Sequence, residues 1–88
     1  MKLVSSIQPF MGLQSIHLYD DNNQKQEYRL ASLSNYAATV MQYLEDYPAI
    51  TELDMHGADQ FCQKIKDEIQ ANLITKYSNN KRIEVNIL

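Results

Sequence analysis

The chain has 88 residues, so residues 1–88 are expected to form one domain without room for a second hydrophobic core. A hydrophobic fraction of 44% and a charged fraction of 22% are typical of globular proteins. The formal net charge is −3 and the basic residues are scattered, which argues against nucleic acid as the main ligand, because nucleic-acid binders gain affinity by neutralising phosphates.

Cysteine usage and hydropathy exclude further classes. Cys62 is the only cysteine, so neither a disulfide within the chain nor a zinc site with several thiolate ligands can form. The segment MKLVSSIQPFMG at residues 1–12 has one lysine and too short an apolar run for a secretion signal. No segment contains the roughly 20 consecutive apolar residues that cross a bilayer. We therefore expect a cytoplasmic protein without a membrane segment.

The first three elements are predicted to be strands of an antiparallel meander. These strands cover residues 3–7, 13–19 and 24–31. Pro9 and Gly12 separate the first two strands, and the run DDNN at residues 20–23 predicts the next turn, because Asx side chains bond to nearby backbone. In the third strand, Tyr28 and Leu30 share one face and charged residues share the other.

A helix is predicted next. Its apolar residues recur at the spacing of one buried stripe, and they are Ala37, Val40, Met41 and Leu44. Ser34 or Asn35 can cap its first amides, and Pro48 ends it because proline has no amide proton.

The second half of the chain predicts a strand, a helix and a final strand, the pattern of a parallel β-α-β unit. The strand covers residues 50–56 and ends at Gly57, and the helix begins near Ala58 or Asp59 and ends before residue 78. The apolar stripe of this helix consists of Phe61, Cys62, Ile65, Ile69 and Leu73. The order β-β-β-α-β-α-β predicts an α/β fold of the mixed α+β kind, with a five-stranded mixed sheet and two helices packed on it.

This succession of elements resembles the ribonuclease H-like fold that RuvC-type resolvases, many transposases and actin-like ATPases share. The resemblance is one of topology over nearly the whole chain. It implies an aspartate in the middle of the first strand and an acid at the end of the fourth, together binding two magnesium ions. Asp54 stands at the matching place in the fourth strand, but the first strand offers only Ser5, Ser6 and Gln8. Because two-metal hydrolysis needs several converging carboxylates, the resemblance implies a catalytically degenerate copy.

The stretch LDMHGADQ contains the candidate metal ligands. Asp54, His56 and Asp59 are residue types that can hold Mg²⁺ or Mn²⁺, and His17 of the second strand is a further candidate. The Asp-x-His pair also resembles the start of a metallophosphoesterase metal site, but the further motifs of those enzymes are missing. Without a full ligand set, we expect no catalytic residue and no bound cofactor.

The alternative interpretation of this stretch is structural. Gly57 can relieve a tight turn from strand to helix, and Asp59 then favours the dipole of the following helix. The crevice beyond the carboxyl ends of parallel strands also binds small ligands in many α/β proteins, although Asp54 and Asp59 would repel an anion there.

The final strand, residues 82–88, is expected to be an edge of the sheet. Its candidate interface residues are Ile83, Val85, Ile87 and Leu88. An uncovered apolar edge can pair with another chain, whereas the charges of the third strand are typical of an edge that stays single. If residues 82–88 instead lie in the centre of the sheet, the same apolar character is explained by burial.

Three functions remain open from the sequence. The favoured one is a small non-catalytic protein-interaction or accessory module, with a protein partner that can be a second copy. Small size and the lack of enzymatic motifs suggest a phage or other mobile element as its source. The alternatives are a metal-dependent nuclease or phosphoesterase remnant that uses Asp54 and His56, and a weak nucleic-acid binder.

Overall fold

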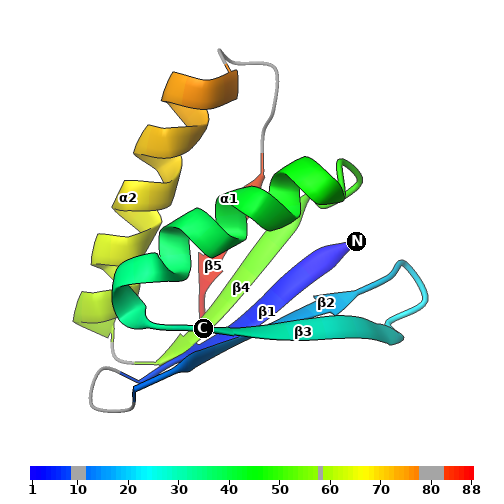
Figure 1. The fold of residues 1–88 in the computed structure, drawn as a ribbon, viewed down its shortest axis with the longest axis horizontal. Helices are drawn as coiled ribbons and strands as arrows, with labels where there is room; N and C mark the ends of the chain where they lie inside the picture. The colour runs from blue at the N-terminus through cyan, green and yellow to red at the C-terminus, as the bar shows by residue number, and fades with distance from the viewer. Residues whose placement is uncertain (9–11, 58, 78–82) are drawn as a thin grey trace.

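A computed structural model describes residues 1–8, 12–57, 59–77 and 83–88. In this part of the chain, five strands and two α-helices follow one another in the predicted order β-β-β-α-β-α-β (Figure 1). The strands are β1 (Lys2–Ile7), β2 (Gln14–Tyr19), β3 (Lys25–Ala31), β4 (Glu52–Gly57) and β5 (Glu84–Ile87). The helices are α1 (Tyr36–Asp46), preceded by the short 3-10 helix η1 (Leu33–Asn35), and α2 (Asp59–Tyr77). The predicted positions are confirmed to within a few residues, while Pro9, Ala58 and residue 82 lie outside the described residues.

The strands form one mixed sheet in the order β3-β2-β1-β4-β5. β1 lies in the middle, where it pairs antiparallel with β2 and parallel with β4. β2 pairs antiparallel with β3, and β4 pairs parallel with β5. The predicted fold class and the five-stranded mixed sheet are therefore confirmed, and β3 and β5 are the two edges of the sheet.

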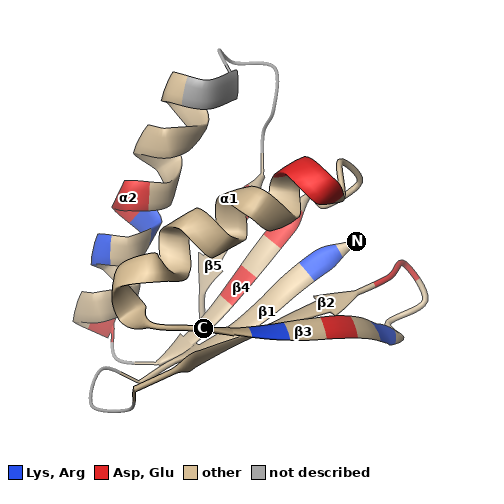
Figure 2. Ribbon diagram, in the orientation of Figure 1, with Lys and Arg blue, Asp and Glu red and all other residues tan. Residues whose placement is uncertain are grey.

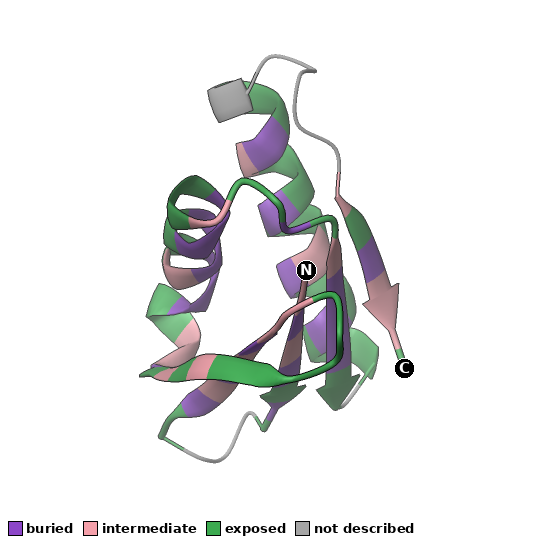
Figure 3. Cartoon of the chain, turned by 90° about the vertical axis from the view of Figure 1, so that its right-hand side faces the viewer, coloured by how far each residue is buried: buried purple, intermediate pink, exposed green. Residues whose placement is uncertain are grey.

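Both helices lie on the same face of the sheet, where they contact each other (Figures 1 and 3). The strands alternate accordingly, so that on β1 the side chains of Leu3, Ser5 and Ile7 are buried while Val4 and Ser6 are not. No described segment covers the opposite face. We call this side the open face; it is formed by every second strand residue, including the row Tyr28, His17, Val4, Asp54 and Asn86, which are aligned across the five strands.

The core lies between the sheet and the helices. Leu18, Leu3, Leu53 and Val85 are aligned across four neighbouring strands and are all buried. The helices cover this row with the predicted apolar stripe of α1, which is buried throughout and consists of Ala37, Val40, Met41 and Leu44. Burial of these side chains supplies the main driving force for folding.

Gly57 ends β4 in a conformation that other residues rarely adopt. Its φ is +148°, and a Cβ atom built at this position would overlap the carbonyl oxygen of Ile7 on β1. The turn from β4 into α2 therefore requires glycine here, as the sequence predicts. Asp59 lies in the first turn of α2, the place that suits an acidic residue.

Two local predictions are corrected by the structure. Asn35 is the N-cap of α1, but its side chain makes no capping bond, and Ser34 lies within η1; the 3-10 turn leads directly into the helix instead. Phe61 was expected on the buried stripe of α2 but is 36% exposed. The other members of that stripe are buried as predicted, and they are Cys62, Ile65, Ile69 and Leu73.

A polar cluster holds α1 against the edge strand β3. Tyr47 Oη, just beyond α1, donates a hydrogen bond of 3.0 Å to Glu27 Oε2. The Arg29 guanidinium lies over the ring of Tyr43, 4.5 Å from its centroid, and 3.5 Å from Asp46 Oδ2. Burial, and then the nearby carboxylate of Glu27, raise the pKa of Tyr43 to about 12, so this phenol stays protonated at physiological pH.

This cluster decides which side of β3 faces outward. Because the charged residues of β3 point to α1, Tyr28 and Leu30 lie on the open face, where they are 60% and 55% exposed. The strand thus places Glu27 and Arg29 toward the helix and the large apolar side chains of Tyr28 and Leu30 toward solvent. This reverses the usual arrangement of an edge strand.

Candidate functional site

β4 places Glu52, Asp54 and His56 on the open face, because Leu53 and Met55 alternate with them and are buried under the helices. Figure 2 shows the acidic positions of β4 beside the basic position at the start of β1. The aspartate and histidine of the predicted metal site therefore do share one face of one strand, as their spacing requires.

Asp54 is only 8% exposed although it lies on the open face. Its neighbours in the sheet are Val4 on β1 and Asn86 on β5. The Asn86 amide donates hydrogen bonds of 2.9 Å to Asp54 Oδ1 and 3.3 Å to Glu52 Oε1. One amide therefore bridges two carboxylates that stand two residues apart on the same strand, and it offsets part of the cost of placing them together.

The repulsion between these carboxylates can be measured. The charge of Asp54, and to a smaller extent burial, raise the pKa of Glu52 above its ordinary value of 4.5. Asp54→Asn removes the charge but keeps an acceptor for Asn86, so we expect the pKa of Glu52 to fall toward 4.5 in this variant. An NMR titration of the Glu52 carboxyl carbon measures this change. Glu84→Gln is the matched control and should lower this pKa less, because Glu84 contributes less to the shift.

The sign of the effect on stability follows from the raised pKa. A protonated Glu52 favours the folded state, and this contribution is lost as the pH rises above about 4.5 and through the pKa of the folded protein. Glu52→Gln should therefore stabilise the protein more at pH 7 than at pH 4, as followed by urea unfolding. If Glu52→Gln changed the free energy of unfolding equally at pH 4 and pH 7, the repulsion from Asp54 would be contradicted.

The three candidate metal ligands are not brought together as a set. Within residues 1–8, 12–57, 59–77 and 83–88, no three His, Cys, Asp or Glu side chains are grouped as a metal ion would require. Asp54 and His56 lie on the open face, whereas Asp59 begins α2 beyond Gly57 and lines a depression between α2 and β5. A site that uses all three residues is therefore not assembled.

His17 does not approach Asp54 either, because β1 lies between them and places Val4 at that point of the row. The ring of His17 stacks instead on Tyr28, with 5.6 Å between centroids. Burial, and then the charge of Lys25, lower the pKa of His17, which favours the neutral imidazole. The position on β1 nearest to Asp54 thus holds a valine rather than an acid.

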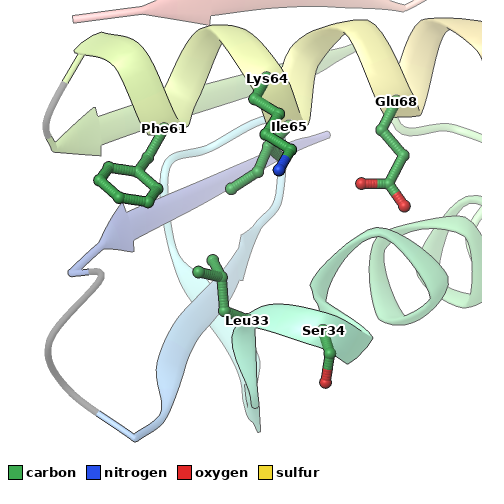
Figure 4. Close-up of a pocket in the computed structure, with 6 residues that line it drawn as sticks. All are labelled: Leu33, Ser34, Phe61, Lys64, Ile65 and Glu68. Carbon is green, nitrogen blue, oxygen red and sulfur yellow. The ribbon is translucent and has the colours of Figure 1, made fainter.

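A groove of about 420 Å³ lies on the helical side of the molecule, between η1 and α2 (Figure 4). Leu33, Phe61 and Ile65 give it an apolar surface, and Lys64 and Glu68 line it one helical turn apart. The hydroxyl of Ser34 points away from it in Figure 4. Among the described residues, the groove lacks the converging polar groups that orient a small ligand.

The predicted interface strand β5 does lie at an edge of the sheet. Val85 is buried, and Ile83 and Ile87 are partly buried against the core, so the apolar face of this strand packs under the helices. Leu88 is 62% exposed. Core packing therefore explains the apolar pattern of the strand, although the strand is not central.

The outer backbone groups of β5 are available for hydrogen bonds to a partner chain. The amides of Glu84 and Leu88 donate hydrogen bonds to carbonyl groups on the β4 side. Because the bonding direction alternates along a parallel strand, the amide and carbonyl groups of Val85 and Ile87 point away from β4. No described segment pairs with them.

No protein-family model, curated protein or solved structure matches this chain. No helix in the described part of the chain is long and apolar enough to cross a bilayer. The assignment of a site therefore depends on the residues and their contacts, and these point to two surfaces, the free edge of β5 and the open face.

Sequence reasoning missed the open face as a candidate surface. The alternation of Tyr28 and Leu30 with charged residues is visible in the sequence, but it predicts equally well a strand with either face inward. The available signal lies in α1 and the residue after it, where Tyr43, Asp46 and Tyr47 provide polar partners for a charged strand face.

Proposed function

We propose that the protein is a small non-catalytic interaction module that pairs with another chain through the free edge of β5. The outward amide and carbonyl groups of Val85 and Ile87 carry this proposal, because an edge strand with free backbone groups is a template for an added strand. A second copy is the simplest partner, since two β5 strands related by a twofold axis can pair antiparallel.

The other edge of the sheet is less suited to pairing. β3 carries charged residues, and its register with β2 shifts between Leu18 and Tyr19. Charges and irregular register are features that keep edge strands from pairing with other chains. In β5, Glu84 is the only charged residue and the register with β4 is regular. This contrast favours β5 as the interacting edge.

We also propose a ribonuclease H-like fold that lacks catalytic activity. The succession of elements and the parallel pairing of β1 with β4 support this relationship. Two-metal hydrolysis needs several carboxylates around cations about 4 Å apart. β1 has no acidic residue, and Val4 is the neighbour of Asp54, so the residues favour an interaction module over a nuclease remnant.

The pairing can be tested by N-methylation of the Ile87 amide, introduced by ligating a synthetic peptide of residues 62–88 at Cys62. The methyl group removes a donor at the free edge and obstructs an added strand, while the bonds from β5 to β4 use other amides. We expect the unmodified protein to dimerise with a Kd on the order of 10–1000 µM, because the interface is small. The methylated protein should remain monomeric in sedimentation equilibrium.

The ligated protein without the methyl group is the control, and circular dichroism should show the same fold for both. A strictly monomeric control at about 1 mM would contradict pairing between copies. Equal dimerisation of the methylated protein would place the contact on another surface.

A further inference from the structure

The open face presents an apolar patch at its β3 side. Tyr28 and Leu30 point outward from β3, and Leu13, which directly precedes β2, is 56% exposed. His17 extends the patch through its stacking on Tyr28. Large apolar side chains gathered on one face of a small protein are typical of a binding surface.

The middle of the open face carries small side chains. Ser6 on β1 and Ser15 on β2 are neighbours in the sheet, with Leu30 on one side and His56 on the other. Val4 precedes Ser6 on the same face of β1. A helix or strand of a partner that lies parallel to β1 on the open face can therefore approach the sheet most closely there.

The opposite side of the open face is acidic. Glu52 and Glu84 are neighbours on β4 and β5, and Asp54 follows Glu52 on the same face. The Asn86 amide donates hydrogen bonds to both Glu52 and Asp54, so these two carboxylates lie close enough for their charges to repel. Lys2 of β1 is the neighbour of Glu52 on the side of the sheet away from Glu84. A further cation placed here would relieve the repulsion.

We propose that the open face docks an amphipathic α-helix of a partner protein, with its apolar stripe against Tyr28 and Leu30 and a flank of Lys or Arg against Glu52 and Glu84. The helix lies along β1, in the direction that helices take when they cover a sheet with parallel strands. This surface is separate from the edge of β5, so the proposal does not depend on strand pairing.

The distribution of charge argues for this occupant over others. A second copy turned about an axis along the strands would place the apolar patch on carboxylates. A copy turned about an axis across the strands would place carboxylates on carboxylates, and each chain already has a net charge of −3. Nucleic acid and anionic lipid would be repelled by the same acidic residues.

The proposal can be tested with a designed peptide and the full chain. The probe is an acetylated and amidated helix of about 18 residues, roughly five turns, built on alanine with leucine on one stripe and lysine along one flank. The matched control peptide has glutamate in place of lysine. In an NMR titration, we expect saturable shift changes at the amides of β1, β2 and β3 with the lysine peptide, and affinity at least about tenfold lower with the glutamate peptide.

Protein variants separate the two halves of the surface. The double variant Tyr28→Ser with Leu30→Ser should bind the lysine peptide at least about tenfold more weakly. Because both side chains are exposed, the fold should be kept. Glu52→Gln with Glu84→Gln should reduce the preference for lysine over glutamate.

Three results would overturn the proposal. One is equal binding of the two peptides, and another is a set of shift changes confined to the groove between η1 and α2 or to β5. The third is a change in the mass of the protein in solution caused by the Tyr28→Ser and Leu30→Ser substitutions, because it would identify a second copy as the occupant.

Discussion

Gly57→Ala is expected to lower the free energy of unfolding by roughly 2–4 kcal/mol. The φ of +148° is unfavourable for alanine, and the added methyl group would overlap the carbonyl oxygen of Ile7. Since this obstacle belongs to the backbone of the central strand, it cannot move away by rotation of a side chain, and β1 or β4 must shift. Urea unfolding followed by circular dichroism measures the change, and Tm should fall by about 10–30 °C for a domain of this size.

Gly12→Ala is the matched control for this substitution. Among the described residues, a Cβ at Gly12 meets no atom within 4 Å, so we expect stability to change by less than about 0.5 kcal/mol. If the two variants lost similar stability, the loss would be a general effect of replacing glycine. The close approach between β4 and β1 would then not be its cause.

Leu53→Ala is expected to cost about 2–5 kcal/mol of stability. Leu53 is fully buried in β4, between Leu3 on β1 and Val85 on β5 in the row of apolar residues beneath the helices. Removal of its side chain leaves a cavity that neighbouring strands cannot close, because the backbone ladders on both sides hold them apart. Chemical unfolding at a fixed pH measures the loss.

Leu30→Ala makes the same chemical change on the open face of β3 and serves as its control. Because Leu30 is 55% exposed, we expect a loss below about 1 kcal/mol. A loss for Leu30→Ala equal to that of Leu53→Ala would mean that Leu30 is buried. That result would contradict the orientation of β3 and remove the apolar half of the docking surface.

The order and approximate bounds of the elements could be predicted because each has a clear local pattern. The stripe of α1, with Val40, Met41 and Leu44 in helical spacing, is buried as its periodicity requires. Gly57 marks the turn between β4 and α2 in the sequence and is required there by its backbone conformation. Such features depend on residues close together in the chain, which a sequence shows directly.

Features that depend on contacts between distant elements could not be predicted in the same way. The direction in which Tyr28 and Leu30 point is set by the contact of β3 with α1. Phe61 is partly exposed because it lines the groove between α2 and η1, two elements far apart in the sequence. The proximity of Asp54 to Asn86 follows from the register of two strands separated by a whole helix. In each case the deciding partner is remote in sequence.

The middle strand of the sheet precedes the other four described strands in the chain. β1 can pair with β2 as soon as β2 is present. Its other edge pairs with β4, for example Lys2 with Glu52, and β4 comes much later in the chain. A nascent chain that extends only as far as α1 would contain the antiparallel sheet of β1, β2 and β3. In that sheet, the edge of β1 that later pairs with β4 is still unpaired. Until β4 is in place, the edge of β1 that later pairs with it is open to pairing with another chain.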